Sequence, residues 1–162
     1  MKKNIDDTAL QGGHNHRGCI DHALQTAEQI CLTKGVRLTA LRKQVLELIC
    51  ANHKAIGAYE LLDLLREQDP KAKPVTIYRA LDFLITAGLV HKIESLNAFI
   101  GCLQAETQHK SAILICDQCK NAYEIDATAV YESLFALSEA VQFQPHCLTL
   151  ELHGLCASCK ED

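Results

Sequence analysis

The chain has 162 residues, of which 48% are hydrophobic and 22% charged, a composition typical of a globular protein. The first residues are basic but are followed by Asp6 and Asp7, and no apolar run reaches the roughly 20 residues of a membrane helix, so neither a signal peptide nor a membrane span is expected and the location is predicted to be cytoplasmic. Nine cysteines in a reducing compartment indicate metal binding rather than disulfides.

The two halves of the chain carry opposite charge, although the formal net charge is only −4. Residues 34–92 contain ten Lys or Arg and six Asp or Glu, whereas residues 93–162 contain three and ten. A basic half joined to an acidic half indicates a DNA-binding module beside a separate partner domain. A chance distribution of surface charge explains the same numbers equally well. The choice between the two interpretations therefore depends on the sequence motifs.

Four amphipathic helices are predicted in the first half of the chain. Residues 1–21 are polar and without period, which predicts a flexible N-terminal tail. Apolar side chains then recur at helical spacing, Thr39 is a predicted N-cap, and the pattern stops at Gly35, Pro70 and Gly88. The segments with this pattern are 22–35, 37–53, 57–70 and 73–90.

After the fourth helix the hydrophobic period changes. The runs LVHKIE (89–94) and NAFIGCL (97–103) are joined by a turn signal and predict a β-hairpin. Helices followed by a small hairpin are typical of a winged helix-turn-helix, so residues 22–103 are predicted to form a winged helix DNA-binding domain. The polar residues 104–111 are predicted to be a hinge.

The acidic remainder, residues 112–162, is predicted to be a small α/β domain. Its expected elements are strands at 112–115 and 122–125, a helix at 127–140, and a strand over the alternating sequence CLTLELHG (147–154). The fold class is therefore α+β, with an N-terminal winged helix and a small C-terminal domain.

Two CxxC units in this second domain predict a metal site. Cys116 and Cys119 are separated by 36 residues from Cys156 and Cys159. Each short turn points two sulfurs inward, so the four thiolates can bind one tetrahedral zinc with no open position. Such a zinc is structural, and a domain this short needs the folding free energy that the metal contributes. Four unrelated thiols or a redox dithiol are the alternatives.

The sequence KPVTIYRALDFL is the predicted DNA-reading helix. In a helix-turn-helix, the second helix places its N-terminal part in the major groove. Thr76, Tyr78 and Arg79 are predicted to face outward there, where Arg binds a guanine edge or a phosphate. Tyr59, at the start of the preceding helix, is a second phosphate candidate. Basic residues expected to add salt-dependent phosphate binding are Arg37, Arg42, Lys71 and Lys73.

These segments together resemble a known family. VRLTALRKQVLELI, AYELLDLL, KPVTIYRALDFL, GLVHKIES, ICDQC and HGLCASC are similar to the ferric uptake regulator (Fur) superfamily and, within it, to zinc uptake regulators, over about residues 24–160. The resemblance implies a homodimeric repressor, active when loaded with zinc, whose winged helix binds an AT-rich inverted repeat of double-stranded DNA and whose C-terminal domain dimerises. It implies zinc-import genes as targets. No enzyme activity, membrane partner or small-molecule substrate is expected.

The resemblance also places a regulatory metal site around the hinge, with His91, Cys102, His109 and Glu124 as ligands. Nitrogen, sulfur and oxygen donors of this kind form a mixed tetrahedral set that suits zinc. Because the ligands come from both sides of the hinge, binding would tie the reading head to the dimer domain at a fixed spacing. About two zinc ions per chain are expected, one structural and one exchangeable.

Three other functions fit parts of the sequence. An iron- or peroxide-responsive regulator of the same superfamily would share the fold, but the stretch TQHKSAILIC holds a single His where those sensors carry a His-rich run with an Asp. A zinc hydrolase needs an open coordination position, which the proposed four-ligand sets do not offer. A structural zinc-ribbon-like interaction protein would keep the four-cysteine site without binding DNA. Loose metal binding is conceivable at the tail residues His14, His16, Cys19 and His22.

Overall fold

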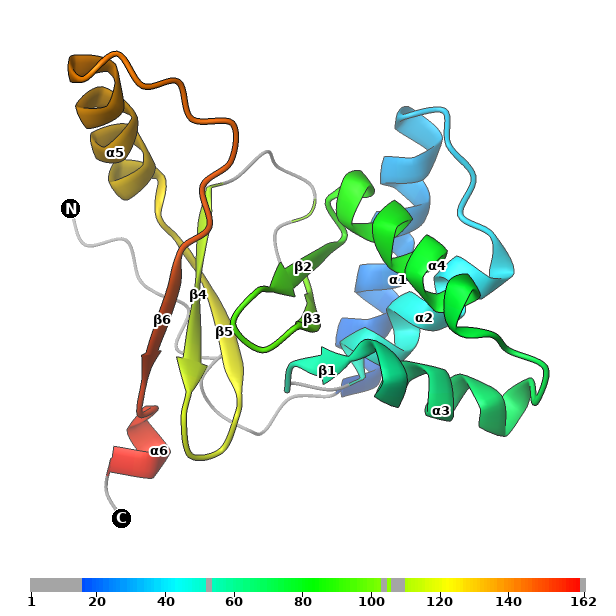
Figure 1. Cartoon of the computed structure of the whole chain (residues 1–162). Helices are drawn as coiled ribbons and strands as arrows, with labels where there is room; N and C mark the ends of the chain where they lie inside the picture. Colours follow the sequence, from blue (N-terminus) through cyan, green and yellow to red (C-terminus); the bar gives the residue numbers. More distant parts are fainter. Residues whose placement is uncertain (1–15, 52–53, 103–104, 106–109, 161–162) are drawn as a thin grey trace.

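The computed structural model describes residues 16–51, 54–102, 105 and 110–160. A bundle of helices with a small hairpin sheet lies on one side of the molecule, and a second sheet with one long helix lies on the other (Figure 1). Most of the predicted hinge, 104–111, lies outside the described residues. No helix in the described ranges is long and apolar enough to cross a membrane.

The first part is built from four helices whose apolar stripes meet in one core. Thr39 caps α2 as predicted, because its hydroxyl accepts a hydrogen bond from the Arg42 N–H at 3.4 Å. Fully buried leucines, isoleucines and valine from α2, α3 and α4 fill the core, including Val45, Leu61 and Ile77. The helices are α1 (His16–Thr33), α2 (Ala40–Cys50), α3 (Ala58–Gln68) and α4 (Pro74–Ala87).

Helix α1 begins at His16, six residues before the start expected from the hydrophobic period. Its first turns are polar and carry no apolar stripe, which is why the sequence pattern places them in the tail. Ile20 nevertheless packs against the helical core, so the additional turn is held by tertiary contact rather than by its own propensity. The predicted tail therefore does not extend to residue 21, because residues 16–21 already belong to α1.

Gly88 ends α4 in the left-handed conformation, with φ +77°. The N–H of Gly88 donates to the Ile85 carbonyl and that of Leu89 to the Leu84 carbonyl, both at 2.9 Å. Gly88→Ala is expected to lower the free energy of unfolding by about 1 kcal/mol, because a Cβ strains this backbone although it meets no neighbouring atom. Denaturant unfolding measures this. The control Gly18→Ala, inside α1, is expected to leave stability unchanged or slightly raised.

The predicted hairpin is present and gains a third strand. Strand β2 (Val90–Ile93) pairs antiparallel with β3 (Ala98–Gly101), and β3 also pairs with a short strand β1 (Ile56–Gly57), in the order β1-β3-β2. The four-residue turn between β2 and β3 includes Asn97 at φ +47°. The two-residue β1 has no alternating pattern of its own, so the sequence does not predict it.

The second part is a three-stranded sheet with the order β5-β4-β6. Strand β4 (Ser111–Cys116) pairs antiparallel with β5 (Ala122–Asp126) and parallel with β6 (Glu151–Gly154); α5 (Thr128–Ala140) follows β5, and the short α6 (Ala157–Lys160) ends the described chain. Strand β6 is shorter than the predicted 147–154. The hydroxyl of Tyr131 donates to the Leu148 carbonyl at 3.0 Å, so this backbone group is used outside a strand ladder.

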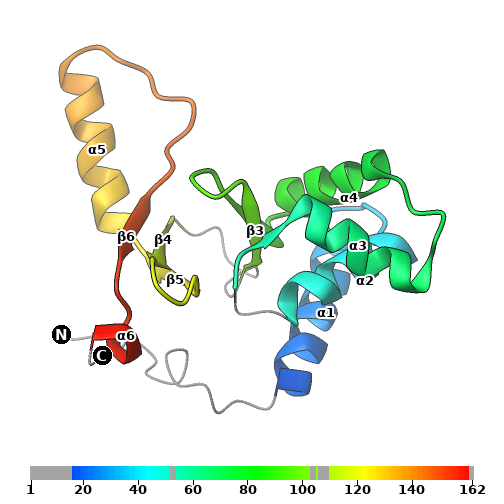
Figure 2. The same ribbon diagram turned by 60° about the horizontal axis from the view of Figure 1, so that its bottom comes forward.

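The hairpin turn reaches across to the second sheet, as both ribbon views show (Figures 1 and 2). Ile93 and Ile100 of the hairpin form one buried cluster with Ile113 and Ile115 of β4. A backbone bridge also joins Lys54 to Asn121, beside the first CxxC unit. The two parts of the molecule therefore share a small apolar contact surface of their own.

Candidate metal centres and nucleic-acid interface

The four cysteines of the two CxxC units come together at one end of the second sheet. Cys116 ends β4, and Cys119 follows in the turn to β5. Cys156 lies directly before α6, and Cys159 lies within it. Their sulfur atoms all lie within 4.8 Å of one another, and the Sγ atoms of Cys119 and Cys156 are 3.7 Å apart. A tetrahedral zinc with bonds of about 2.3 Å requires sulfurs about 3.8 Å apart, so the donor set fits this ion.

The protonation of these thiols also favours a cation. Backbone N–H donors, first that of Cys156 at 3.4 Å from the Cys116 sulfur, lower the pKa of Cys116 to about 6. Hydrogen bonding with the Cys156 side chain, together with burial, raises the pKa of Cys159 to about 12. Cys116 is therefore a readily formed thiolate, whereas Cys159 resists ionisation beside it, and a divalent ion would remove that resistance.

Three of the four predicted regulatory ligands also meet. His91 lies on β2, Cys102 directly follows β3, and Glu124 lies on β5 of the second sheet. Their donor atoms lie within 4.8 Å of one another. The Nε2 atom of His91 is 2.8 Å from Oε1 of Glu124, and the Cys102 sulfur is 4.0 Å from the same oxygen. The fourth predicted ligand, His109, lies outside the described residues.

This three-residue cluster has the chemistry of a zinc site. Tetrahedral zinc with ordinary bond lengths places nitrogen about 3.4 Å and sulfur about 3.6 Å from a ligand oxygen. The observed nitrogen–oxygen separation of 2.8 Å is shorter than this by about 0.6 Å, and the sulfur–oxygen separation of 4.0 Å is longer by about 0.4 Å, so small side-chain shifts would let the three donors bind one ion. The Glu124 side chain is only 2% exposed, so its carboxylate has little water to solvate it. Most importantly, two donors belong to the hairpin of the helical part and the third to the other sheet.

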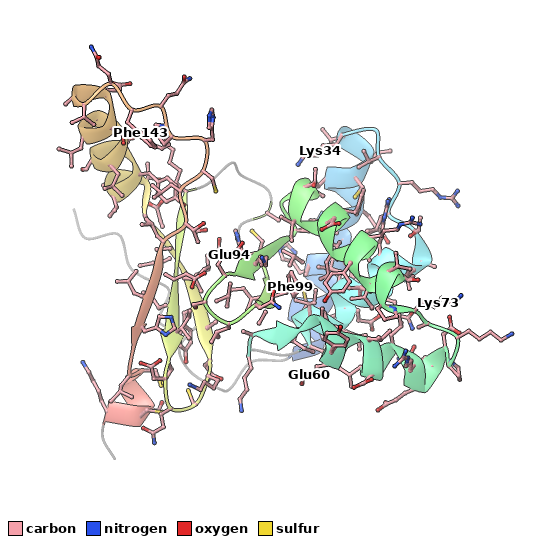
Figure 3. All side chains as sticks on the ribbon, in the orientation of Figure 1. Lys34, Glu60, Lys73, Glu94, Phe99 and Phe143 are labelled. Atoms are coloured by element: carbon pink, nitrogen blue, oxygen red, sulfur yellow. The ribbon has the colours of Figure 1, made fainter. Side chains whose placement is uncertain are left out.

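The predicted DNA-reading face is exposed on α4. Tyr78 is 42% exposed, Arg79 is also exposed and Thr76 is half-buried, whereas Ile77 of the same turn lies in the core. Tyr59 projects from the first turn of α3 with 70% of its surface exposed. Lys73 is the N-cap residue of α4 and projects from the outer end of the helical part (Figure 3).

Arg42 of α2 and Arg37, which lies just before that helix, have different roles. The guanidinium of Arg42 lies 3.5 Å from the centre of the Phe83 ring and donates to the Arg37 carbonyl at 2.6 Å. Arg42, counted from the sequence among the phosphate-binding residues, therefore braces the chain before α2. Arg37 itself is exposed, and this brace holds its backbone in place.

Sequence reasoning missed Val75 on this face. Its side chain is 53% exposed, and it lies three and four residues before Tyr78 and Arg79, on the same side of α4. An exposed aliphatic group at the N-terminal end of a reading helix is suited to contact thymine methyl groups. The same helical spacing that selects Tyr78 and Arg79 from the sequence also selects Val75.

A winged helix whose hairpin supplies two of three clustered metal-ligand donors, joined to a sheet that supplies the third, is the architecture of a metal-binding, DNA-binding regulator. A family model described as the ferric uptake regulator family matches residues 33–153. The zinc uptake regulation protein of Escherichia coli (strain K12) is 47% identical over 139 residues, which are 85% of this chain and 81% of that protein. The chain belongs to the ferric uptake regulator family, a family of transcriptional regulators rather than enzymes.

Solved structures agree with this assignment and with the predicted fold class. A zinc uptake regulator complexed with zinc and DNA superposes with a TM-score of 0.85 at 45% identity, covering 88% of this chain and 95% of that one. Holo XcZur gives 0.81 at 45% identity, and apo XcZur gives 0.52 at 44% identity, each covering 88% of this chain and 99% of the other. The arrangement of this chain is thus more similar to the holo structure than to the apo structure.

Proposed function

We propose that this protein is a zinc-responsive transcriptional repressor, which binds operator DNA as a zinc-loaded homodimer and controls genes of zinc uptake and homeostasis. The observation that carries the proposal is the donor cluster shared between the two parts of the chain. His91 and Cys102 belong to the hairpin of the reading domain, and Glu124 belongs to the other sheet. An ion held by all three restrains one domain relative to the other.

Two zinc ions per chain are part of this proposal. The four-cysteine cluster would hold a structural ion, since four thiolates leave no position for exchange with solvent ligands. The regulatory ion would be held by His91, Cys102 and Glu124, with His109 as the fourth ligand. Its role would be to link the two domains and not to catalyse a reaction. Restraining the reading domain before DNA arrives lowers the entropic cost of binding, and DNA must then tighten zinc in return.

The homodimer is supported by an apolar surface on the second part. Val130, Leu134 and Leu137 lie on one side of α5, Val141 follows directly at its C-cap, and all four are exposed, between 37% and 73%. Phe143 continues this surface beyond the end of the helix, where Figure 3 labels it. A symmetric dimer built on this face would carry two reading helices, which corresponds to an inverted repeat in DNA, for which the family resemblance favours an AT-rich sequence.

A DNA-binding titration at buffered free zinc tests the proposed function. The probe is a duplex that the zinc-loaded protein selects from a randomised pool, and Fe(II) and Mn(II) are titrated alongside. Affinity is expected to rise with free zinc well before it rises with either other metal. Activation by Fe(II) at the lower free concentration would instead assign the protein to iron sensing within the same family.

Arg79→Ala is expected to weaken binding to the selected duplex by about 10- to 100-fold, because a guanidinium on the reading helix supplies a bidentate contact. Arg79→Lys is the matched variant: it keeps the charge but loses the planar fork. If Arg79 reads a base, the lysine variant should lose most of the affinity as well. Full affinity in Arg79→Ala would favour an interaction protein that does not read DNA with this helix.

A further inference from the structure

The turn of the wing hairpin is held by a carboxylate from the other domain. The N–H of Glu94 donates to Oε1 of Glu151 at 2.6 Å, and the N–H of Ser95 donates to Oε2 at 3.1 Å. Glu151 is the first residue of β6, 56 residues beyond Ser95 in the chain. Both oxygens of one side chain thus bind consecutive backbone donors at the tip of the hairpin. Figure 3 labels Glu94 at the end of the hairpin that faces the second sheet.

A second side chain of the same strand supports the turn. His153 lies two residues after Glu151, and its Nε2 atom is 3.1 Å from the Ser95 hydroxyl. Its Nδ1 atom is 3.1 Å from Oδ1 of Asp117, which orients the ring towards the turn. Three polar contacts therefore converge on Glu94 and Ser95 from β6. Hydrogen bonds from Ser95 and from the two N–H groups outweigh the effect of burial and lower the pKa of Glu151, so it is a carboxylate at neutral pH.

The local charges are compatible with this arrangement. The Glu94 side chain points its carboxylate at Lys92, whose Nζ lies 2.5 Å from Oε2 of Glu94. The negative charge of Glu94 is therefore balanced within the hairpin, and Glu151 meets backbone donors rather than an unpaired carboxylate. The Glu94 side chain remains 58% exposed, so solvent screens its ion pair with Lys92, and that pair contributes little to stability.

The hairpin is consequently attached to the second sheet at both ends of β2. His91, near the start of this strand, joins Glu124, and the turn after its end joins Glu151. Glu94, the first clamped residue of the turn, is three residues after His91, about 10 Å away at the usual rise of a strand. A single attachment leaves a domain free to pivot about it, whereas two separated attachments and the isoleucine cluster between them define one orientation.

We propose that Glu151 is a positioning residue for DNA binding, which fixes the orientation of the reading domain by clamping the wing turn. This inference rests on the proposed function, since it describes how the zinc-dependent orientation is maintained. Neither Glu151 nor His153 belongs to either donor cluster. The wing turn would therefore serve as the point at which the reading domain contacts the second sheet.

Glu151→Gln in the full-length, zinc-loaded protein tests the clamp. The amide keeps the shape but can accept only one of the two hydrogen bonds, and its NH2 group opposes the other backbone N–H. Glu132→Gln on α5 is the charge-matched control, because Glu132 is exposed and lies opposite the apolar stripe of that helix. Ser95→Ala removes the hydroxyl that contacts His153 and Glu151, while both backbone donors remain.

Two measurements decide the outcome. Hydrogen–deuterium exchange of the peptide containing Glu94 and Ser95 is expected to become about three- to tenfold faster in Glu151→Gln and less so in Ser95→Ala, with no change in Glu132→Gln. Binding to the duplex selected by the wild type is expected to weaken about three- to tenfold at saturating zinc, and more zinc should be needed for half-maximal binding. The zinc of the four-cysteine cluster should remain bound in every variant.

Equal exchange at the wing turn in Glu151→Gln and Glu132→Gln would overturn the clamp, whatever happens to DNA binding. Faster exchange with unchanged affinity would also overturn it, because the contact would then not position the reading domain. If Glu151→Gln yields no folded dimer, Ser95→Ala carries the same test at smaller amplitude. Failure of the proposed function has a different signature: the wild-type protein selects no duplex at any zinc concentration, while the exchange difference at the turn persists.

Discussion

Replacing Cys156 by serine is expected to unfold the second part of the chain and to abolish dimer formation and DNA binding. Within the described residues, neither α5 nor β6 contributes a buried side chain. The buried side chains that lie on this side are few and mostly small, such as Ala112, Ile113 and Ala127. Such a core cannot offset the entropy of ordering about 50 residues, whereas a structural zinc contributes about 10–16 kcal/mol of apparent binding free energy.

The measurements are zinc content, far-UV circular dichroism on heating, and molecular mass by light scattering. Cys156→Ser is expected to lose one zinc per chain, to melt at a lower temperature in a transition that chelators reproduce in the wild type, and to run as a monomer. Cys147→Ser is the matched control, because Cys147 is exposed and outside both clusters. A Cys156→Ser protein that remained a stable dimer with full zinc content would show that the four sulfurs do not form a structural site.

Removing the sulfur of Cys102 is expected to uncouple DNA binding from zinc without unfolding the protein. Cys102 is half-buried at the end of the hairpin, and its N–H continues the strand ladder to the Leu89 carbonyl at 3.0 Å. Cys102→Ala keeps this backbone bond and removes only the thiolate. Because coupling free energies of 1–3 kcal/mol correspond to factors of about 5–150, affinity at saturating zinc should fall by that order and its zinc dependence should flatten.

Zinc content separates this variant from the Cys156→Ser variant. Cys102→Ala should keep the tightly held zinc and the dimer but lose the exchangeable zinc measured by competition with a chelator. Glu124→Gln should behave in the same way, because it removes the charged oxygen that lies between His91 and Cys102. Tight, fully zinc-dependent DNA binding by Cys102→Ala would rule out this cluster as the sensor.

Much of the architecture could be predicted because local patterns encode it. The helical period, the Thr39 cap and the change of period after Gly88 predict the four helices and the hairpin. A tetrahedral ion needs four ligands, which predicts that the two CxxC units pair. The structure accordingly brings together Cys116, Cys119, Cys156 and Cys159. Identity to relatives then supplies the family.

Other features depend on contacts between residues far apart in the sequence. The first turns of α1 and the short strand β1 lack a period of their own and are held by packing or pairing with distant residues. Arg42 is predicted from the sequence to bind phosphate, and only the tertiary structure shows that its guanidinium also stacks on the Phe83 ring. Local interactions determine which helices and strands form, but only the tertiary structure shows which side chains contact residues far away in the sequence.

The sequence by itself therefore determined the α+β class, the four-cysteine cluster and the exposed face of the predicted reading helix, because each depends on local spacing or on the coordination number of one ion. It suggested the set of His91, Cys102, His109 and Glu124 only through family resemblance, since no local pattern brings residues so far apart in the chain together. The tertiary structure decided that these donors meet across two domains and that the wing turn rests on Glu151. Both depend on the packing of the hairpin against the second sheet, through isoleucines that local sequence patterns cannot pair.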